Sequence, residues 1–353
     1  MKQFCFAIAL AGVLSGCAPT APSSNGSGAG GNAGAAGNVT QAGAGSGTGG
    51  VSVGGVAGSA ALAGMGGAMG GGQAGTSGAA AGGGAGGVGA GGEGPDTSVK
   101  PSMGCMNPTM QALDEWVHYK LTIQNAERDY AVRLPKTFDP TKPHRLLFTF
   151  PWGNGDSETT SPYYNQPNAD GIFVGVTSLD GFFEYTANSY DVEYFDKLLE
   201  VVKANFCVDE NRIFASGMSS GSWFTNVLGC QRSNVLRAQG NISGCWPDDG
   251  RLDPAVEAGM PSTVCEKRNI AGIFIHDASD GTNTLECGIM ARNRLLLHNG
   301  CTMETRPVEP DPCVEYQGCK SGYPVIWCQT DGTGHSQQDG LTIPAIYNFF
   351  AQF

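Results

Sequence analysis

The feature that most constrains the fold is a glycine-flanked turn in the segment Arg212–Gly221, which reads RIFASGMSSG and ends in the pattern Gly-x-Ser-x-Gly. The pattern alone is weak in a chain with 55 glycines, but here it follows a β-rich run and precedes a helix-like segment, Ser222–Cys230. Side chains would collide in so tight a turn, so glycine is required on either side. We expect the turn to lift the Ser219 hydroxyl out of a sheet and to leave the Ser220 amide free to bind an oxyanion.

The N-terminal segment predicts where the protein is delivered. Lys2 is followed by an apolar stretch, Phe4–Leu14, that is too short to span a bilayer. The motif Leu-Ser-Gly-Cys ends at Cys17 and resembles the lipobox of secreted bacterial lipoproteins. We interpret residues 1–17 as a lipoprotein signal peptide with Cys17 as the lipidated residue, and an ordinary secretory signal is the alternative. The protein is therefore expected to be exported, and to be lipid-anchored to the cell envelope or extracellular.

Residues 18–97 are expected to form a flexible tether. The stretch consists mainly of Gly, Ala and Ser, with very few charged residues and no aromatic ones. Such a composition buries too little apolar surface to offset the loss of chain entropy on folding. Its Gly-Gly pairs follow no strand and lack the spacing of a phosphate-binding loop, so we assign it no chemistry.

Residues 98–353 are long enough for one sizeable hydrophobic core, and we expect them to form a single domain and a monomer. The net charge of the whole chain is −12, and nearly all of it falls in this part. An acidic domain argues against nucleic acid and against anionic membrane surfaces as partners. No further segment is apolar and long enough to cross a membrane, so contact with a membrane is expected only through the lipid anchor.

Cysteine usage agrees with export. Ten cysteines lie behind the signal, and an even number in that setting predicts up to five disulfides. A zinc site is the alternative, but the domain has no Cys-x-x-Cys pair and no His/Cys cluster, so no metal is expected. The sequence alone leaves the pairing of the cysteines open. They are Cys105, Cys207, Cys230, Cys245, Cys265, Cys287, Cys301, Cys313, Cys319 and Cys328.

Apolar strand-like runs alternate with helical ones along this domain. The predicted strands are 130–135, 145–150, 171–176, 271–276 and 324–328, besides the one before the turn, and the predicted helices are 192–205, 222–230, 292–299 and 343–353. Buried strands separated by helices indicate a mostly parallel central sheet flanked by helices. Together with the serine turn, this arrangement predicts a disulfide-bonded α/β-hydrolase fold.

The order of catalytic residues in that fold is serine, then acid, then histidine, and it narrows the candidates. Only five histidines are present, and two of them precede Ser219. His298 lies in an amphipathic helical run, and His276 ends a strand too early to follow an acid at that strand's tip. His335 comes after the predicted strand 324–328 on a glycine-containing loop. We expect it to reach the turn and to accept the serine proton.

Two aspartates are candidates for the acid that orients the histidine and stabilises its protonated form. Asp277 and Asp280 both follow the predicted strand 271–276. Either is also compatible with a turn, since Asp280-Gly281 is a good turn signal. Spacing from the strand favours Asp280 slightly, and Glu286 is a distant third.

Several segments together resemble the secreted feruloyl esterases and the related polyhydroxybutyrate depolymerases and acetylxylan esterases. The most specific are FCVDENR at 206–212, CQR at 230–232, IHDASD at 275–280 and GYPVIWCQTDGTGH at 322–335. The resemblance extends from Tyr130 to His335 and implies a serine esterase. In that family a helix ending in Asn-Gly-Cys follows the acid at a near-constant distance, which implies Asp280 as the acid, beside Ser219 and His335.

One departure from the family concerns the oxyanion hole. Family members usually carry His-Gly after the strand equivalent to 145–150, whereas this chain reads Pro151-Trp152-Gly153. Pro151 has no N–H to donate. The second donor, besides the Ser220 amide, is therefore expected to be the amide of Trp152 or of Gly153. The Trp152 indole would then flank the acyl group, and packing against the edge of the sheet is the alternative.

The resemblance implies hydrolysis of feruloyl or similar hydroxycinnamoyl esters on plant cell-wall polysaccharide, without a metal or an organic cofactor. A polyhydroxybutyrate depolymerase or an acetylxylan esterase is the enzymatic alternative. The expected partner is thus an ester-bearing polysaccharide or polyester. An inactive carbohydrate-binding surface protein is the alternative from another class. The Pro151-Trp152 segment favours it, but the complete set of serine, acid and histidine opposes it.

Overall fold

The computed structural model describes residues 94–158, 170–247, 265–266 and 268–353. The predicted signal peptide, Cys17 and the predicted tether up to residue 93 lie outside the described residues. Within the described part of the chain, no helix combines the length and the hydropathy that crossing a membrane requires.

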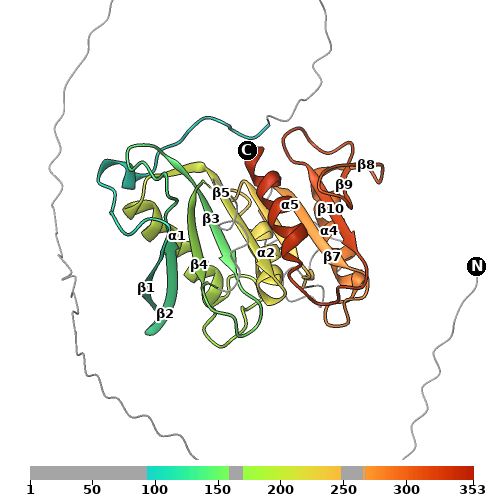
Figure 1. The fold of residues 1–353 in the computed structure, drawn as a ribbon, viewed down its shortest axis with the longest axis horizontal. Helices are drawn as coiled ribbons and strands as arrows, with labels where there is room; N and C mark the ends of the chain where they lie inside the picture. The colour runs from blue at the N-terminus through green and yellow to red at the C-terminus, as the bar shows by residue number, and fades with distance from the viewer. Residues whose placement is uncertain (1–93, 159–169, 248–264, 267) are drawn as a thin grey trace, which may run out of the picture. The chain divides into compact units, whose positions relative to one another are not determined.

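A single sheet forms the frame of the domain (Figure 1). In the described ranges its strand order is β1-β2-β4-β3-β5-β6-β7-β10-β9-β8. Neighbours from β4 to β10 run parallel, while β1, β2, β9 and β8 pair antiparallel at the two edges. The predicted, mostly parallel sheet is therefore confirmed. The strands are β1 (Trp116–Ile123), β2 (Ala126–Arg133), β3 (His144–Phe150), β4 (Ile172–Val176), β5 (Val208–Met218), β6 (Ala238–Ile242), β7 (Ala271–Asp277), β8 (Thr305–Pro307), β9 (Cys313–Tyr316) and β10 (Val325–Thr330).

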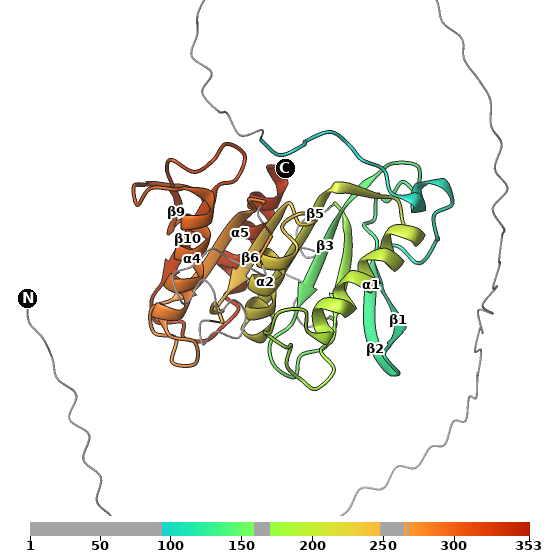
Figure 2. The same cartoon turned by 180° about the vertical axis from the view of Figure 1, so that it is seen from behind.

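Helices cover both faces of this sheet (Figures 1 and 2). One core joins the sheet to α1, α2 and α4, through residues such as Phe195, Val227 and Leu295. A second core joins the opposite face to α5, around Ile346. Because both faces are covered, β4 and β7 are buried along their whole length. The helices are α1 (Tyr190–Asn205), α2 (Ser220–Gln231), α4 (Leu285–Asn299) and α5 (Asp339–Ala351), besides a short 3-10 helix, η1 (Met103–Met106).

Disulfides tie the connecting segments to this frame, and the expectation of a disulfide-bonded domain is confirmed. All ten cysteines of the described residues are paired. Each crosslink stabilises the fold mainly by restricting the unfolded chain. The pairs are Cys105–Cys207, Cys230–Cys265, Cys245–Cys287, Cys301–Cys319 and Cys313–Cys328.

Some elements differ from those that the sequence pattern predicts. The pattern misses β6, because its sequence, AQGNI, shows neither alternation nor an apolar run, although every residue of the strand is buried. It also misses the edge strands β1, β8 and β9. The four predicted helices begin earlier than predicted, α1 and α2 by two residues each. The difference is larger for α4, which begins at Leu285 rather than at Arg292, and for α5, which begins at Asp339 rather than at Ile343.

The parallel strands bring their carboxyl ends to one edge of the sheet, where loops of α/β proteins commonly form a ligand site. β5, β7 and β10 end there, and the loops after them carry Ser219, Asp280 and His335. The segments after β3 and β4 open at the same edge, because these two strands are parallel to β5.

Candidate active site

The turn between β5 and α2 holds Ser219 in an unusual backbone conformation, with φ 52° and ψ −118°. Residues other than glycine rarely adopt a positive φ, and such strain persists only where the surroundings enforce it. Close packing enforces it here. A Cβ atom on Gly217 would lie 2.3 Å from the carbonyl carbon of Gly221, and a Cβ on Gly221 would lie 2.0 Å from the carbonyl oxygen of Phe150. Both flanking glycines are thus sterically required.

A continuous chain of hydrogen bonds joins the three residues that the sequence singles out. His335 Nε2 lies 2.9 Å from Ser219 Oγ, and His335 Nδ1 lies 2.8 Å from Asp280 Oδ2. The Asp280 side chain is fully buried, whereas the imidazole is about one-fifth exposed. A nucleophile, a base and an orienting acid in this geometry can carry out acyl transfer through a covalent intermediate.

The other oxygen of Asp280 fixes the carboxylate in place. Oδ1 accepts hydrogen bonds from the amides of Thr282 and Asn283, both at 2.9 Å. Burial opposes ionisation of this carboxyl group, but the hydrogen bonds from His335 and from these two amides outweigh burial. The pKa of Asp280 therefore lies below its ordinary value of 3.8. The group is an anion at neutral pH, as the stabilisation of an imidazolium requires.

The two alternative acids lie elsewhere. Asp277 is completely buried at the end of β7 and accepts hydrogen bonds from residues of its own turn and of the loop that precedes His335. Glu286 is exposed in the first turn of α4. The structure thus places Asp280, and neither alternative, against the imidazole of His335.

A second histidine lies behind the acid, and the sequence interpretation gives it no role. His276 is buried in β7, and its Nε2 donates a hydrogen bond to the carbonyl oxygen of Asn283 at 2.8 Å. The same nitrogen lies 3.8 Å from Asp280 Oδ2. His276 therefore fixes the backbone of the turn that carries Asp280. The sequence feature that could have indicated this role is the position of His276 at the end of a predicted buried strand.

The Ser220 amide stands at the start of α2, where the first N–H groups have no acceptor within the helix. The side chain of Ser220 is anchored behind it. Ser220 Oγ accepts hydrogen bonds from the Tyr185 hydroxyl at 2.9 Å and from the amide of Phe183 at 3.3 Å. These contacts fix the side chain of the residue that follows Ser219.

The segment after β3 passes directly beside this turn. A Cβ atom on Gly221 would lie 2.6 Å from the carbonyl oxygen of Pro151, which shows how closely the two backbones approach. Trp152 and Gly153 line the same open pocket as Ser219 and His335. The residues predicted to supply a second oxyanion donor are therefore adjacent to the serine.

The pocket above Ser219 has a volume of about 460 Å³ and aromatic walls. Trp152 is 36% exposed and Phe182 is 57% exposed, so both present ring surface to whatever enters. A Cβ atom on Gly153 would lie 2.2 Å from Phe182 Cε1, so the Phe182 ring rests against that backbone. The sequence interpretation does not identify Phe182. Its signal was an aromatic pair, Phe182-Phe183, in the loop after a buried strand.

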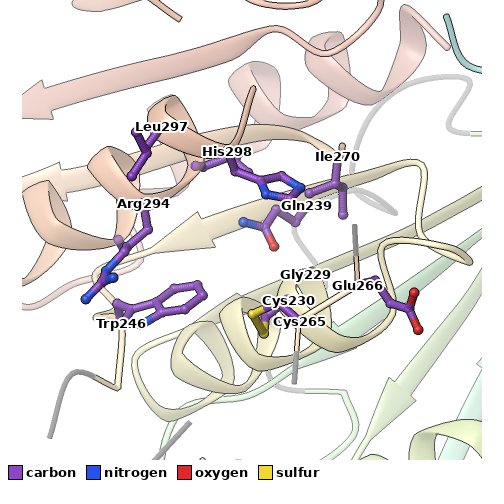
Figure 3. Close-up of a pocket in the computed structure, with 12 residues that line it drawn as sticks. Gly229, Cys230, Gln239, Trp246, Cys265, Glu266, Ile270, Arg294, Leu297 and His298 are labelled. Carbon is purple, nitrogen blue, oxygen red and sulfur yellow. A yellow bond between two sulfur atoms is a disulfide. The ribbon is translucent and has the colours of Figure 1, made fainter. Parts of the chain in front are cut away.

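A separate hollow of about 170 Å³ lies between α2 and α4 and is mostly apolar (Figure 3). It is lined by Trp246, Arg294 and the Cys230–Cys265 disulfide, among others. None of the three hydrogen-bonded residues contributes to it. Across the described ranges, no group of three or more His, Cys, Asp or Glu side chains is placed to hold a metal ion.

Known proteins resemble this chain in sequence, and a solved structure resembles it in fold. No protein-family model matches the sequence. Feruloyl esterase D of Neurospora crassa is 29% identical over 283 residues, which cover 72% of this chain and 92% of that protein. Feruloyl esterase C of Emericella nidulans is 32% identical over 227 residues, which cover 59% of this chain and 76% of that protein. The solved acetyl xylan esterase from Aspergillus awamori matches the fold with a TM-score of 0.55 at 13% identity, over 67% of this chain and 99% of the other.

The fold and these relatives define a serine carboxylic-ester hydrolase with an α/β-hydrolase fold. Within that class, the chain belongs to the feruloyl esterase family that includes the Emericella nidulans enzyme.

Proposed function

We propose that the enzyme hydrolyses feruloyl or related hydroxycinnamoyl esters on plant cell-wall polysaccharide, with Ser219, His335 and Asp280 as its catalytic triad. The observation that carries this proposal is the unbroken pair of hydrogen bonds, at 2.9 Å and 2.8 Å, that links the three side chains. Two relatives are named feruloyl esterases, which supports a feruloyl group as the acyl part of the substrate. The aromatic walls of the pocket suit a planar aromatic acid of this kind.

The chemistry follows from this geometry. Ser219 Oγ attacks the ester carbonyl while His335 Nε2 takes its proton, and Asp280 holds the imidazole and stabilises the imidazolium. The Ser220 amide and a second amide, from Trp152 or Gly153, stabilise the tetrahedral oxyanion. The intermediate collapses to an acyl-enzyme as the bond to the sugar oxygen breaks and His335 protonates that oxygen to a hydroxyl. Water, deprotonated by His335, then attacks the acyl carbon; the bond to Ser219 Oγ breaks, His335 returns the proton to Oγ, and the free acid leaves.

Export with a lipid anchor is part of the same proposal. The five disulfides support an oxidising compartment, where such bonds persist. The sequence around Cys17 supports lipidation, and residues 18–97 would tether the catalytic domain to the envelope. Mass spectrometry of the exported protein tests this directly. A diacylglycerol-modified Cys17 is the expected mature N-terminus, and the Cys17→Ser variant should be released unlipidated or remain unprocessed. An unmodified Cys17 in the mature wild-type protein would refute the anchor.

One assay series tests the catalytic proposal. Methyl ferulate, feruloylated arabinoxylan, chromogenic acetyl esters and hydroxybutyrate oligomers are compared as substrates for the wild type and for Ser219→Ala. We expect feruloyl esters to show the highest kcat/KM and the variant to lose activity by about 10⁴-fold or more, as removal of a triad serine does. A fluorophosphonate should label Ser219 alone. Preference for acetyl or hydroxybutyrate esters would assign the alternative substrates, and labelling of another residue would overturn the nucleophile.

A further inference from the structure

The loop that carries His335 has little regular structure of its own. It connects β10 to α5, and Asp331, Gly332 and Thr333 are exposed. Gly332 and Gly334 have φ values of 88° and 62°, so the backbone here follows neither a strand nor a helix. Such a loop needs contacts from outside its own sequence to hold a histidine within hydrogen-bonding distance of a nucleophile.

Asp277 supplies those contacts from the end of β7. Its Oδ1 accepts hydrogen bonds from the Ser279 amide (2.9 Å), the Ser279 hydroxyl (2.5 Å) and the Gly334 amide (3.0 Å). Its Oδ2 accepts from the Thr330 hydroxyl (2.7 Å) and from the amide (3.1 Å) and hydroxyl (2.6 Å) of Thr333. Gly334, the last residue held in this way, immediately precedes His335.

The carboxylate is fully buried, and in the described part of the chain it forms no ion pair. Burial opposes its ionisation, but the hydrogen bonds from Ser279, Thr333 and Thr330 outweigh burial and hold the pKa of Asp277 well below its ordinary value. Hydrogen bonds to an ionised acceptor are about twice as strong as neutral ones. An anion saturated by donors from two segments is therefore a strong clamp between them.

We infer that Asp277 is a positioning residue for catalysis: its carboxylate fixes the backbone of Thr333 and Gly334, and thereby holds His335 between Ser219 and Asp280. This inference rests on the catalytic role proposed for His335. The two aspartates of one short turn thus have different roles. Asp280 contacts the imidazole, and Asp277 contacts the loop that carries it.

An asparagine at position 277 cannot reproduce the clamp. Hydroxyl donors can rotate and become acceptors, but a backbone N–H cannot. In one orientation the new amide group faces the Thr333 N–H, and in the other it faces the N–H groups of Ser279 and Gly334. Asp277→Asn should therefore release the loop. Thr333→Val is the milder change, because it removes one hydroxyl donor on an exposed residue, and Thr333→Ser retains that donor.

The experiment measures kcat and KM with methyl ferulate for the wild type and each variant. The unfolding temperature of each protein is measured separately. We expect kcat to fall about 100-fold in Asp277→Asn, the effect of displacing a catalytic group by about 1 Å, with KM changed by less than about threefold. Thr333→Val should lose about tenfold in kcat and Thr333→Ser should match the wild type. In a His335→Ala background, Asp277→Asn should cause no further loss, because it acts through the imidazole.

Asp209→Asn is the matched control. Asp209 is another buried carboxylate that accepts bonds from backbone amides and from Arg212, but it lies at the start of β5, at the opposite edge of the sheet. Its replacement should lower the unfolding temperature and leave kcat unchanged. If Asp277→Asn does not fold, the comparison of kcat between Thr333→Val and Thr333→Ser tests the inference instead. An unchanged kcat in Thr333→Val and Asp277→Asn, with His335→Ala inactive, overturns the inference alone. Full activity in His335→Ala overturns the proposed triad itself.

Discussion

The serine turn and the histidine loop meet at one site, but different forces hold them. The turn is fixed by sterics between near neighbours in the sequence, since the Cβ position of Gly217 is occupied by the backbone of Gly221. The loop is fixed by a side chain 57 positions away, because Gly334 donates to Asp277. The first kind of constraint can be recognised from a local sequence motif. The second kind depends on the folded sheet that brings β7 and β10 side by side.

The sharpest way to test the steric account is to add one methyl group to the serine turn and one to the loop after β7. Gly217→Ala would place a Cβ 2.3 Å from the carbonyl carbon of Gly221, and neither backbone can yield. We expect no measurable esterase activity and a loss of about 3 kcal/mol or more in the free energy of unfolding. Gly281→Ala, beside Asp280, is the control, because its Cβ would meet no atom within 4 Å. Comparable activity in the two variants would contradict the steric account of the turn.

The fold followed from the sequence because its signals are local. Apolar runs of strand length predict β3, β4 and β7, and the glycine-flanked serine predicts the turn after β5. β6 escapes prediction because Gln239, Gly240 and Asn241 carry no apolar signal, and only its neighbours in the sheet make it a strand.

The candidate site divides along the same line. Ser219 and His335 can be chosen from a motif and from chain order. Asp277 and Asp280 follow the same strand, and spacing and the family resemblance favour Asp280 without giving Asp277 a role. The three-dimensional arrangement gives each its contact: Asp280 lies against the imidazole and Asp277 against the loop that precedes it. Phe182 could not be identified from the sequence for another reason. The role of an exposed aromatic residue in a loop becomes visible only when the pocket that it lines is known.

The two aspartates provide the next test. Asp280→Asn should lower kcat by about 10³- to 10⁴-fold, because the altered side chain favours the wrong imidazole tautomer. Its unfolding temperature should stay close to that of the wild type, since Asn retains an oxygen for the amides of Thr282 and Asn283. Asp277→Asn should lose less kcat but more stability. The reverse ranking in kcat, with Asp280→Asn nearly fully active, would show that Asp277 is the catalytic acid.

Acid titration of stability sharpens the same contrast. The pKa of Asp277 is lowered in the folded enzyme, so its ionised form stabilises the fold. That contribution is complete above the unfolded pKa of about 3.9 and is lost as the pH falls through the folded pKa. The difference in unfolding free energy between the wild type and Asp277→Asn should thus be constant from about pH 7 to pH 5 and shrink below about pH 4. Urea unfolding at each pH measures it, and a difference that grows in acid would contradict the clamp.

The smallest expected effect concerns the two walls of the pocket. Trp152 belongs to the segment packed beside the serine turn, while Phe182 projects from the loop after β4. Replacing either ring by alanine leaves the Trp152 and Gly153 amides in the chain, so oxyanion stabilisation should persist. We expect kcat/KM for methyl ferulate to fall about tenfold, the equivalent of one lost aromatic contact, with little change for acetyl esters.

Leu297→Ala is the control for these two variants, since Leu297 is 79% exposed on α4 and lies outside the pocket. It should leave both activities unchanged. A loss confined to feruloyl esters would make the two rings the walls of the acyl site. An equal loss on acetyl and feruloyl esters, together with a lower unfolding temperature, would instead make Trp152 part of the support of the serine turn. Trp152 would then belong to the closely packed part of the site, together with Gly217. Only Phe182 would remain as a ring that selects the acyl group.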